Sequence, residues 1–197
     1  AGAPATAVTG SAWPGLPVLP PPQIGPYRLD ELIGAGGMGA VYRALRNDGL
    51  FDQRVAIKFI RPLHRSLPAE AMVDAERRLL ARMRHPGIAH ILDAGTTLNG
   101  LPFLVMEYVE GLRLDRHAEA AALDLPARVA LLREVCAAIA HAHQNLVLHC
   151  DLKPDNILVT AEGRPKLIDF GVARLQSLAD SGLPLAYTRA YASPQRL

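Results

Sequence analysis

Short stretches with the two-residue period of β-strands follow one another in the first half of the chain, after residue 26. In the first stretch Tyr27, Leu29 and Ile33 fall on one face of such a strand. The later stretches are rich in apolar residues and are separated by polar turns such as Asn99-Gly100. The pattern predicts five strands, at residues 27–33, 40–45, 54–60, 88–95 and 101–108.

A short helix is expected at residues 113–118. Helical spacing of apolar residues predicts the longest helix at residues 126–144, with Pro126 in its first turn. His141 and His143 near its end point in different directions, which suits a position at a helix C-terminus better than a metal site. We expect the buried face of the longest helix to consist of Val129, Leu132, Val135, Cys136 and Ile139, flanked by Leu131.

A two-stranded hairpin is predicted at residues 157–159 and 166–168, between two polar loops. It would bring two carboxylates, an ammonium group and an amide to one edge: Asp151, Lys153, Asn156 and Asp169. Oxygen ligands of this kind hold hard cations such as Mg²⁺, which in turn hold phosphates. The sequence therefore predicts a magnesium and phosphate site around this hairpin.

The composition limits the possibilities without naming a function. A net charge of +2 is too small to argue for a nucleic-acid partner. Cys136 and Cys150 give neither metal spacing nor a disulfide framework, which favours a reducing, cytoplasmic compartment. No run of about 18 apolar residues is present. Because the chain starts without methionine and ends at Leu197 in mid-pattern, we expect a piece of a longer protein whose other parts could carry a membrane anchor.

The first 25 residues are rich in Ala, Gly and Pro and include Pro20-Pro21-Pro22. Such a segment buries too little apolar surface to offset its ordering entropy, so we expect a disordered linker. A ligand for a proline-binding domain is the alternative.

Four glycines lie within the six residues from Gly34 to Gly39, between two predicted strands. Glycines let a backbone approach a ligand closely and point its amides at phosphate oxygens. A dinucleotide-binding fold would need a helix after them, whereas Val41 and Tyr42 favour a strand. The arrangement is typical of a flap over a nucleotide, and a plain flexible hairpin turn is the alternative.

Lys58 lies inside an apolar strand, between Ile57 and Phe59. A lysine on a strand usually just faces water. Residues 69–84, however, predict a helix that contains Glu76, and a Lys58–Glu76 pair would hold the ammonium group ready for phosphate oxygens. The apolar stripe of this helix consists of Leu79, Leu80 and Met83, and it is expected to end at His85-Pro86.

Taken in order, these motifs resemble the protein kinases, and specifically the bacterial relatives of eukaryotic serine/threonine kinases. The resemblance covers residues 27–197, and its motifs have the family's order and spacing. They are Gly34-x-Gly36-x-x-Gly39-x-Val41, Val55-Ala56-Ile57-Lys58, Glu76, Met106-Glu107-Tyr108-Val109, His149-Cys150-Asp151, Asn156, Asp169-Phe170-Gly171 and Ala192-Ser193-Pro194.

The resemblance implies ATP and Mg²⁺ as cofactors and assigns roles to the matching residues. Lys58 would bind the α- and β-phosphates and pair with Glu76, while Asp151 would accept or orient the proton of the substrate hydroxyl. Lys153 would steady the transferred phosphoryl group. Asn156 and Asp169 would hold Mg²⁺. The nucleotide-binding set would be Ile33, Gly34, Ala35, Gly36, Gly37, Met38, Gly39, Val41, Ala56, Lys58, Met106, Glu107, Val109 and Leu158.

Three features depart from the family pattern. Cys150 stands where an arginine usually pairs with a phosphate on the activation loop, so we expect activity without phosphorylation of that loop. An ordinary buried thiol is favoured over a redox role. Gln195 replaces a glutamate that normally pairs with a later arginine, so the substrate-binding segment would be held differently. The chain also stops at Leu197, before several helices that the family has. Without these helices, we expect an apolar flank of the larger lobe to be exposed.

The implied fold class is α+β: a β-rich N-lobe with one main helix, and a helical C-lobe that is incomplete. We expect the linker at 1–25, the N-lobe and hinge at 26–109, and a partial C-lobe at 110–197. The expected function is transfer of the γ-phosphate of ATP to Ser or Thr hydroxyls of protein substrates, Ser or Thr being favoured by Asp-Leu-Lys at 151–153. A nucleotide-binding pseudokinase and an inactive fragment are the alternatives, although no catalytic position of the family is missing.

Overall fold

The computed structural model describes residues 20–36, 39–49, 52–60, 83–169, 174–175 and 191. Two compact units make up the chain: residues 1–65 with 91–108, and residues 66–90 with 109–197. Most of the expected linker lies outside the described residues, as does the expected helix at 69–84 except for Met83 and Arg84, which are not helical.

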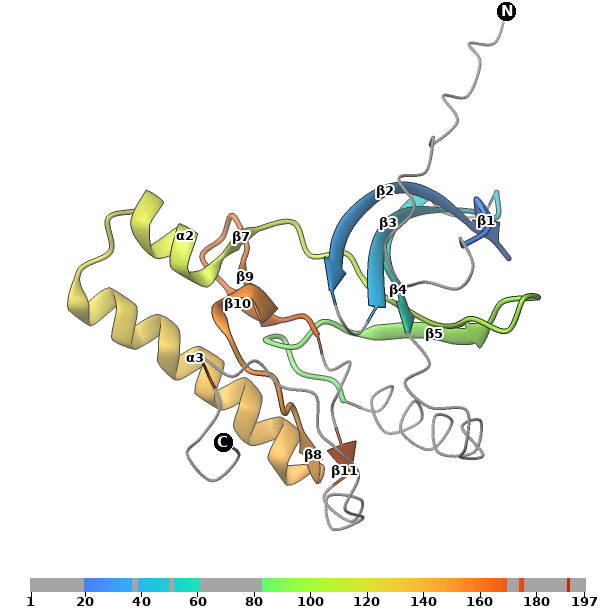
Figure 1. Cartoon of the computed structure of the whole chain (residues 1–197). Coiled ribbons are helices and arrows are strands. Elements are labelled where there is room, and N and C mark those ends of the chain that lie inside the picture. The colour runs from blue at the N-terminus through green and yellow to red at the C-terminus, as the bar shows by residue number, and fades with distance from the viewer. Residues whose placement is uncertain are drawn as a thin grey trace, which may run out of the picture. The chain divides into compact units, whose positions relative to one another are not determined.

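The first unit contains a six-stranded antiparallel sheet, drawn as a curved layer in blue to green in Figure 1. Its strands lie in the order β1-β2-β3-β4-β6-β5. They are β1 (Gln23–Ile24), β2 (Tyr27–Gly36), β3 (Gly39–Asn47), β4 (Asp52–Ile60), β5 (Ile91–Thr96) and β6 (Pro102–Glu107). All five predicted strands are present. The strand predicted from residue 88 begins only at Ile91, because Ile88 forms a parallel bridge with Leu167 in the second unit.

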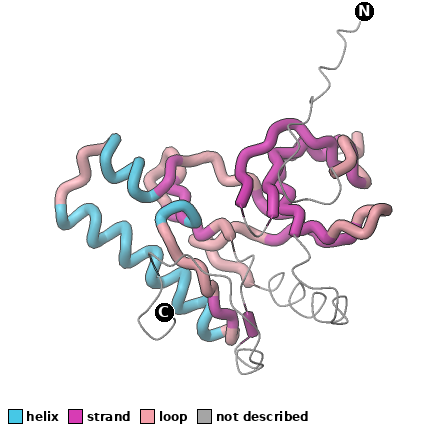
Figure 2. Tube along the Cα trace, viewed as in Figure 1, coloured by secondary structure: helices cyan, strands magenta, loops and turns pink. Residues whose placement is uncertain are grey.

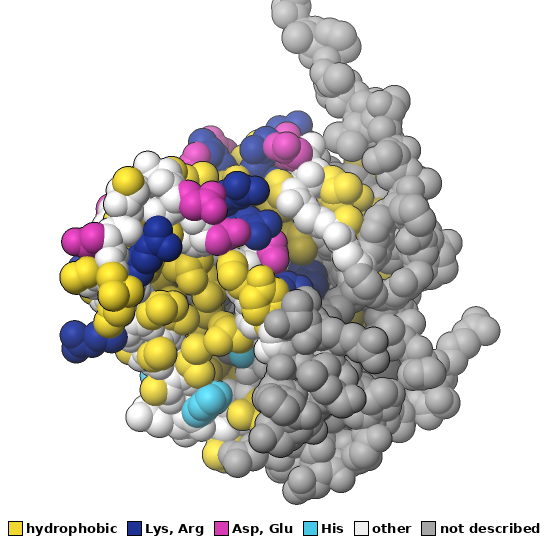
Figure 3. Space-filling view, turned by 60° about the vertical axis from the view of Figure 1, so that its left-hand side comes forward, with side chains coloured by type: hydrophobic (Ala, Val, Ile, Leu, Met, Phe, Trp, Pro, Cys, Tyr) yellow, Lys and Arg dark blue, Asp and Glu magenta, His cyan; other side chains and the backbone are white. Residues whose placement is uncertain are grey.

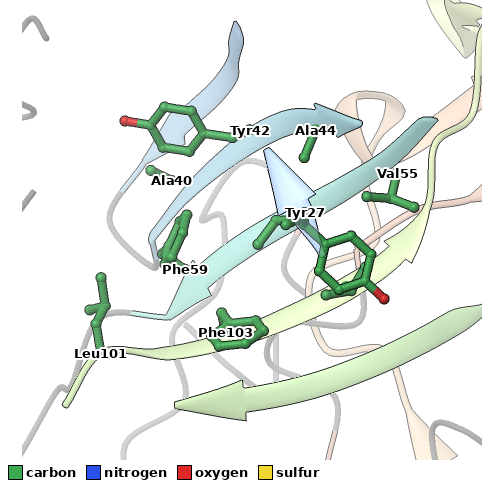
Figure 4. Packing of buried hydrophobic residues seen from close by; sticks show 10 residues of the cluster. Tyr27, Ala40, Tyr42, Ala44, Val55, Phe59, Leu101 and Phe103 are labelled. Carbon is green, nitrogen blue, oxygen red and sulfur yellow. The ribbon is translucent and has the colours of Figure 1, made fainter. Parts of the chain in front are cut away.

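One face of this sheet carries an apolar core that includes four aromatic rings (Figure 4). Tyr42 and Phe59 meet edge to face with ring centroids 5.7 Å apart, and the ring of Phe103 lies 6.3 Å from that of Phe59. Such pairs stabilise by about 0.5–1.5 kcal/mol beyond the area that they bury. Because side chains alternate along β4, this core takes Val55, Ile57 and Phe59 and leaves the residues between them to the other face.

Gly39 allows β3 and β4 to approach each other closely. Its φ is +152°, and a Cβ atom added there would lie 1.9 Å from the carbonyl oxygen of Phe59. Only glycine can occupy this position without a shift of the backbone. The last glycine of the predicted loop therefore has a packing role of its own.

The second unit combines two helices with short strands, shown in cyan and magenta in Figure 2. The small sheets have the orders β10-β9-β7 and β11-β8. The elements are β7 (Leu112–Arg113), α2 (Leu114–Ala120), α3 (Leu125–Gln144), β8 (Val147–Leu148), the 3₁₀ turn η1 (Pro154–Asn156), β9 (Ile157–Val159), β10 (Pro165–Leu167) and β11 (Arg174–Leu175). The predicted hairpin is β9 and β10, with the second strand one residue earlier than expected.

Helix α3 begins one residue before the predicted start and buries a different face. Asp124 caps it by accepting a hydrogen bond from the amide of Ala127. Its buried residues are Leu131, Val135, Ala138 and Ala142, which follow the helical period.

The prediction for this face was wrong for three of its five members. Val129, Leu132 and Cys136 are exposed, Ile139 is half-buried, and Val135 alone is buried. The face that packs is the one toward β8 and β10, which lie later in the chain. On the side that carries α2 and α3, hydrophobic side chains cover much of the described surface (Figure 3). No described helix is long and apolar enough to cross a bilayer.

Candidate active site

The loop after β8 turns sharply and buries a carboxylate. Cys150 adopts the left-handed conformation, with φ at +65°, which costs a residue with a Cβ about 1–2 kcal/mol. The turn leaves the residues on either side, His149 and Asp151, only 5% and 7% exposed. The amide of Asp151 donates to Nδ1 of His149 at 3.4 Å. Local strain at Cys150 thus accompanies a buried Asp151.

Two side chains from the following turn hold Asp151. Nζ of Lys153 lies 2.9 Å from Oδ2 of Asp151. Nδ2 of Asn156 donates to the carbonyl oxygen of Asp151 at 2.8 Å and to its Oδ2 at 3.3 Å. Pro154 starts η1, and this turn brings Asn156 back toward Asp151. Three of the sequence-predicted residues therefore meet in one hydrogen-bonded cluster.

Asp169, the fourth predicted residue of this site, follows the hairpin β9–β10. The amide of Ile168 donates to the carbonyl oxygen of Asn156 at 3.0 Å, so Asp169 comes one residue after a direct link to Asn156. Nδ2 of Asn156 is engaged with Asp151, which leaves its Oδ1 as the atom that can ligate a cation. An amide oxygen and a carboxylate fit Mg²⁺, which takes its remaining ligands from water and substrate phosphates.

The described residues contain no group of three or more His, Cys, Asp or Glu side chains that could hold a metal ion. The predicted pair, Asn156 and Asp169, is a smaller set and stays a prediction. Phe170 and Gly171, which follow Asp169, lie outside the described residues. So do Gln195 and three hydroxyl residues of the expected activation loop: Ser177, Ser181 and Thr188.

The glycine segment forms the closed end of the hairpin β2–β3. Gly34 pairs with Val41, and Gly36 pairs with Gly39. Ala35 pairs with Ala40, and Ile33 is 44% exposed. Gly37 and Met38, at the tip, lie outside the described residues.

Lys58 lies on the face of β4 opposite to the aromatic core, and it is only 3% exposed. Its cross-strand neighbours are Val41 and Leu104, while Ala56 on the same face pairs with Met106. Ala56, Leu104 and Met106 form an apolar cluster of their own, against which Val41 packs. Four predicted nucleotide contacts thus share one sheet face: Val41, Ala56, Lys58 and Met106.

The remaining predicted nucleotide contacts are spread over both units. Glu107 ends β6, opposite Val55. Val109, which is 8% exposed, and the half-buried Leu158 on β9 belong to the second unit. Glu76 lies outside the described residues, so the Lys58–Glu76 pair stays a prediction.

Arg113 is a residue of this region that the sequence did not indicate. Its Nη1 lies 2.6 Å from Oδ1 of Asp155 in η1, and its Nη2 lies 2.9 Å from Oδ2 of Asp115 in the first turn of α2. The hydrogen bond to Asp115 raises the pKa of Arg113, and the negative charge of Asp155 acts in the same direction. The prediction of a helix from residue 113 missed it, because the pairing of β7 with β9 joins residues far apart in sequence.

Comparison with known proteins agrees with the fold and the motifs. The protein kinase domain matches residues 27–197. The chain therefore belongs to the protein kinase family, and the predicted α+β, kinase-like fold class is confirmed. The resemblance to bacterial relatives of eukaryotic serine/threonine kinases is confirmed as well, by the relatives that the chain matches.

Three mycobacterial relatives represent these matches. The chain is 39% identical over 180 residues to serine/threonine-protein kinase PknD of Mycobacterium tuberculosis strain CDC 1551, covering 88% of this chain and 26% of that protein. It is 34% identical to PknB of M. tuberculosis strain H37Ra and to PknB of Mycolicibacterium smegmatis, covering 86% of this chain and 28% of each relative. The chain thus spans about a quarter of the length of these relatives.

Proposed function

We propose that this chain carries the catalytic centre of a protein kinase that uses ATP and Mg²⁺ to phosphorylate Ser or Thr side chains of proteins. The observation that carries the proposal is the buried Asp151, held by Lys153 and Asn156 within 3.3 Å. A carboxylate whose orientation is fixed in this way is suited to accept or orient the proton of a substrate hydroxyl.

In this proposal Asp151 receives the hydroxyl proton of the acceptor side chain through its carboxylate. Lys153, already 2.9 Å from Asp151, is the nearest positive charge in the loop and would balance the charge that spreads over the phosphoryl oxygens. Asn156 and Asp169 would hold Mg²⁺, which neutralises phosphate charge when it is bound. Positioning and charge stabilisation account for most of the rate enhancement in such reactions.

The first unit would bind the nucleotide. Its glycine hairpin can direct backbone amides at phosphates, and the buried Lys58 on the adjoining strand can meet the α- and β-phosphates. The apolar cluster of Ala56, Leu104 and Met106 on the same face suits an adenine ring. Because the donor is ATP, we expect the chain to act in the cytoplasm.

The same proposal includes independence from activation-loop phosphorylation. The thiol of Cys150 cannot make the bidentate, charge-assisted bonds by which an arginine holds a phosphate. The loop conformation around Asp151 instead has support from Lys153 and Asn156 in the turn that follows.

A transfer assay tests this function. The chain, and a form extended past Leu197, are incubated with labelled ATP, Mg²⁺ and a generic protein substrate, with Lys58→Met and Asp151→Asn as controls. Label on Ser or Thr that both substitutions abolish supports the proposal. Nucleotide binding without transfer in either form would identify a pseudokinase, and transfer by the extended form alone would show that this chain is an inactive fragment.

A further inference from the structure

Strand β7 is held tightly against the strand that follows the catalytic loop. Arg113 pairs with Leu158 of β9, and Leu112 pairs with Val159. A Cβ atom at the preceding Gly111 would lie 2.4 Å from the carbonyl oxygen of Val159, so the two backbones approach as closely as glycine allows. The backbone of Arg113 is therefore anchored to Leu158, two residues after η1 ends.

The guanidinium group of Arg113 joins two elements. Its Nε and Nη2 donate to the two carboxylate oxygens of Asp115 at 3.2 and 2.9 Å, which is a bidentate pair. Its Nη1 lies 2.6 Å from Oδ1 of Asp155. A planar group with donors on three nitrogens can hold both carboxylates at once, whereas the single ammonium group of a lysine presents no such fork. The first turn of α2 and the turn η1 are thus linked through one side chain.

Asp155 lies between two residues that contact Asp151: Lys153, two positions before it, and Asn156, directly after it. Lys153 pairs with the carboxylate of Asp151, and Asn156 donates to both its carbonyl and its carboxylate oxygen. Since Asp155 lies inside the three-residue turn η1, holding its side chain limits rotation of the whole turn. A shift of η1 would move the donor that orients Asp151.

Because the Arg113–Asp155 ion pair is exposed, its loss should affect activity much more than stability. The side chains of Arg113 and Asp155 are 44% and 46% exposed. Ion pairs as exposed as these add little to the free energy of unfolding. Misplacement of a catalytic group, in contrast, reduces turnover steeply.

We propose that Arg113 is a positioning residue of the phosphotransfer site: it holds η1 through Asp155, so that Asn156 keeps Asp151 oriented. This role rests on the proposed kinase function. It concerns an arginine that is absent from the kinase motifs found in the sequence.

Steady-state kinetics on the natural full-length protein test the role. Arg113→Met and Asp155→Asn should each lower kcat about tenfold, with KM for ATP and for the protein substrate within about twofold. The double variant should lose no more than either single variant, because both break the same link. Arg113→Lys should recover part of the loss.

The matched control is Arg116→Met. Arg116 lies on α2, three residues after Arg113, and pairs with Glu119 at 3.3 Å, with both side chains more than half exposed. This ion pair stays within α2 and does not reach η1. The kcat of Arg116→Met should equal that of the unsubstituted protein, and its melting temperature should match that of Arg113→Met. An unchanged kcat in Arg113→Met, or additive losses in the double variant, would overturn the role. A change in KM for the protein substrate at constant kcat would overturn it in favour of direct substrate contact.

An NMR measurement that does not depend on activity tests the role of Arg113 independently of the proposed function. The side-chain amide of Asn156, followed by NMR, should exchange with solvent faster in Arg113→Met than in Arg116→Met or the unsubstituted protein. Identical exchange in all three would refute the link. If the unsubstituted protein transferred no phosphate, the proposed function would fail, and the amide signal would still decide whether Arg113 holds the turn.

Discussion

At the scale of single residues, the segment from the loop after β8 to the turn η1 is marked by buried polar side chains. His149, Asp151 and Asn156 are each at most 7% exposed. Buried polar groups are costly unless they find partners. Here Asn156 supplies two hydrogen bonds to Asp151, and Lys153 supplies an opposite charge. Cys150 keeps its left-handed backbone within this set, which indicates that the surrounding bonds outweigh its strain.

Cys150 leads to a prediction about regulation. Because a thiol cannot pair with a phosphate, Ser177→Ala and Ser181→Ala should leave the rate of phosphoryl transfer within about twofold of the unsubstituted value. Initial rates measured for each variant check this. A large loss in either variant that an aspartate at the same position restores would contradict it. Thr188→Ala is less informative, since the resemblance to serine/threonine kinases implies that this threonine also contacts Asp151 and Lys153.

Gly39 gives a prediction about stability. In Gly39→Ala the added Cβ atom would clash with the carbonyl oxygen of Phe59, 1.9 Å away, and we expect a loss of about 2–4 kcal/mol in the free energy of unfolding. Gly100→Ala is the matched control: φ is +80° there, but no atom lies within 4 Å of the added Cβ. The control should lose only about 1 kcal/mol. Urea unfolding measures both, and equal losses would show that the close approach at Gly39 is not needed.

At the scale of elements, the orientation of α3 can be tested with two valines on one helix. Val135 is 4% exposed and Val129 is 48% exposed. Val135→Ala should reduce the free energy of unfolding by about 1–3 kcal/mol, and Val129→Ala should change it by less than about 0.5 kcal/mol. Chemical unfolding gives both values. The reverse order would mean that the face first predicted from the sequence is the packed one.

A pair of histidines joins α3 to the segment before β5 within the second unit. The rings of His85 and His141 lie 5.1 Å apart, and Nδ1 of His85 accepts a hydrogen bond from the amide of Gly87 at 3.0 Å. Burial lowers the pKa of His85, and the charge of His141 lowers it further. On the other side of His141, Nδ2 of Asn145 lies 3.5 Å from its Nε2.

Because the pKa of His85 is lowered in the folded state, the stability of the protein should decrease as the pH falls. Above the ordinary histidine pKa of about 6.5 His85 is neutral in the folded and unfolded states, so its contacts stabilise fully. As the pH falls below this value, the unfolded state takes up the proton first and stability is lost. Thermal unfolding between pH 7.5 and 5.5 should therefore show a smaller fall in melting temperature for His141→Phe than for the unsubstituted protein. The control, His143→Phe, changes an exposed residue of the same helix turn and should keep the full dependence. An unchanged slope in His141→Phe would refute the coupling.

At the scale of the whole molecule, the features that the sequence predicted well are local ones. The strands β2 to β6 and the hairpin β9–β10 follow from alternation over a few residues, and the loop residues Asp151, Lys153 and Asn156 meet because they are close in the chain. A kinase-like order of motifs then gave the fold class.

Features that depend on distant partners could not be predicted. The buried face of α3 is chosen by β8 and β10, and helical spacing alone fits either of two apolar stripes. The ion pair between Arg113 and Asp155 depends on the pairing of β7 with β9, and no local sequence pattern predicts that pairing. Even strand β5 loses its expected first residues because Ile88 pairs with Leu167 instead.

In the proposed function, Asp151 orients the acceptor hydroxyl for phosphoryl transfer. The most direct test is single-turnover transfer from ATP to a serine peptide, measured with ATP affinity on the same samples of the natural full-length protein and of Asp151→Asn. We expect Asp151→Asn to lower the transfer rate by about 10²–10⁴-fold and to leave the Kd for ATP within about twofold, since Asp151 acts on the acceptor rather than on the nucleotide. An undiminished transfer rate in Asp151→Asn, or a loss matched by weaker ATP binding, would rule out this role of Asp151.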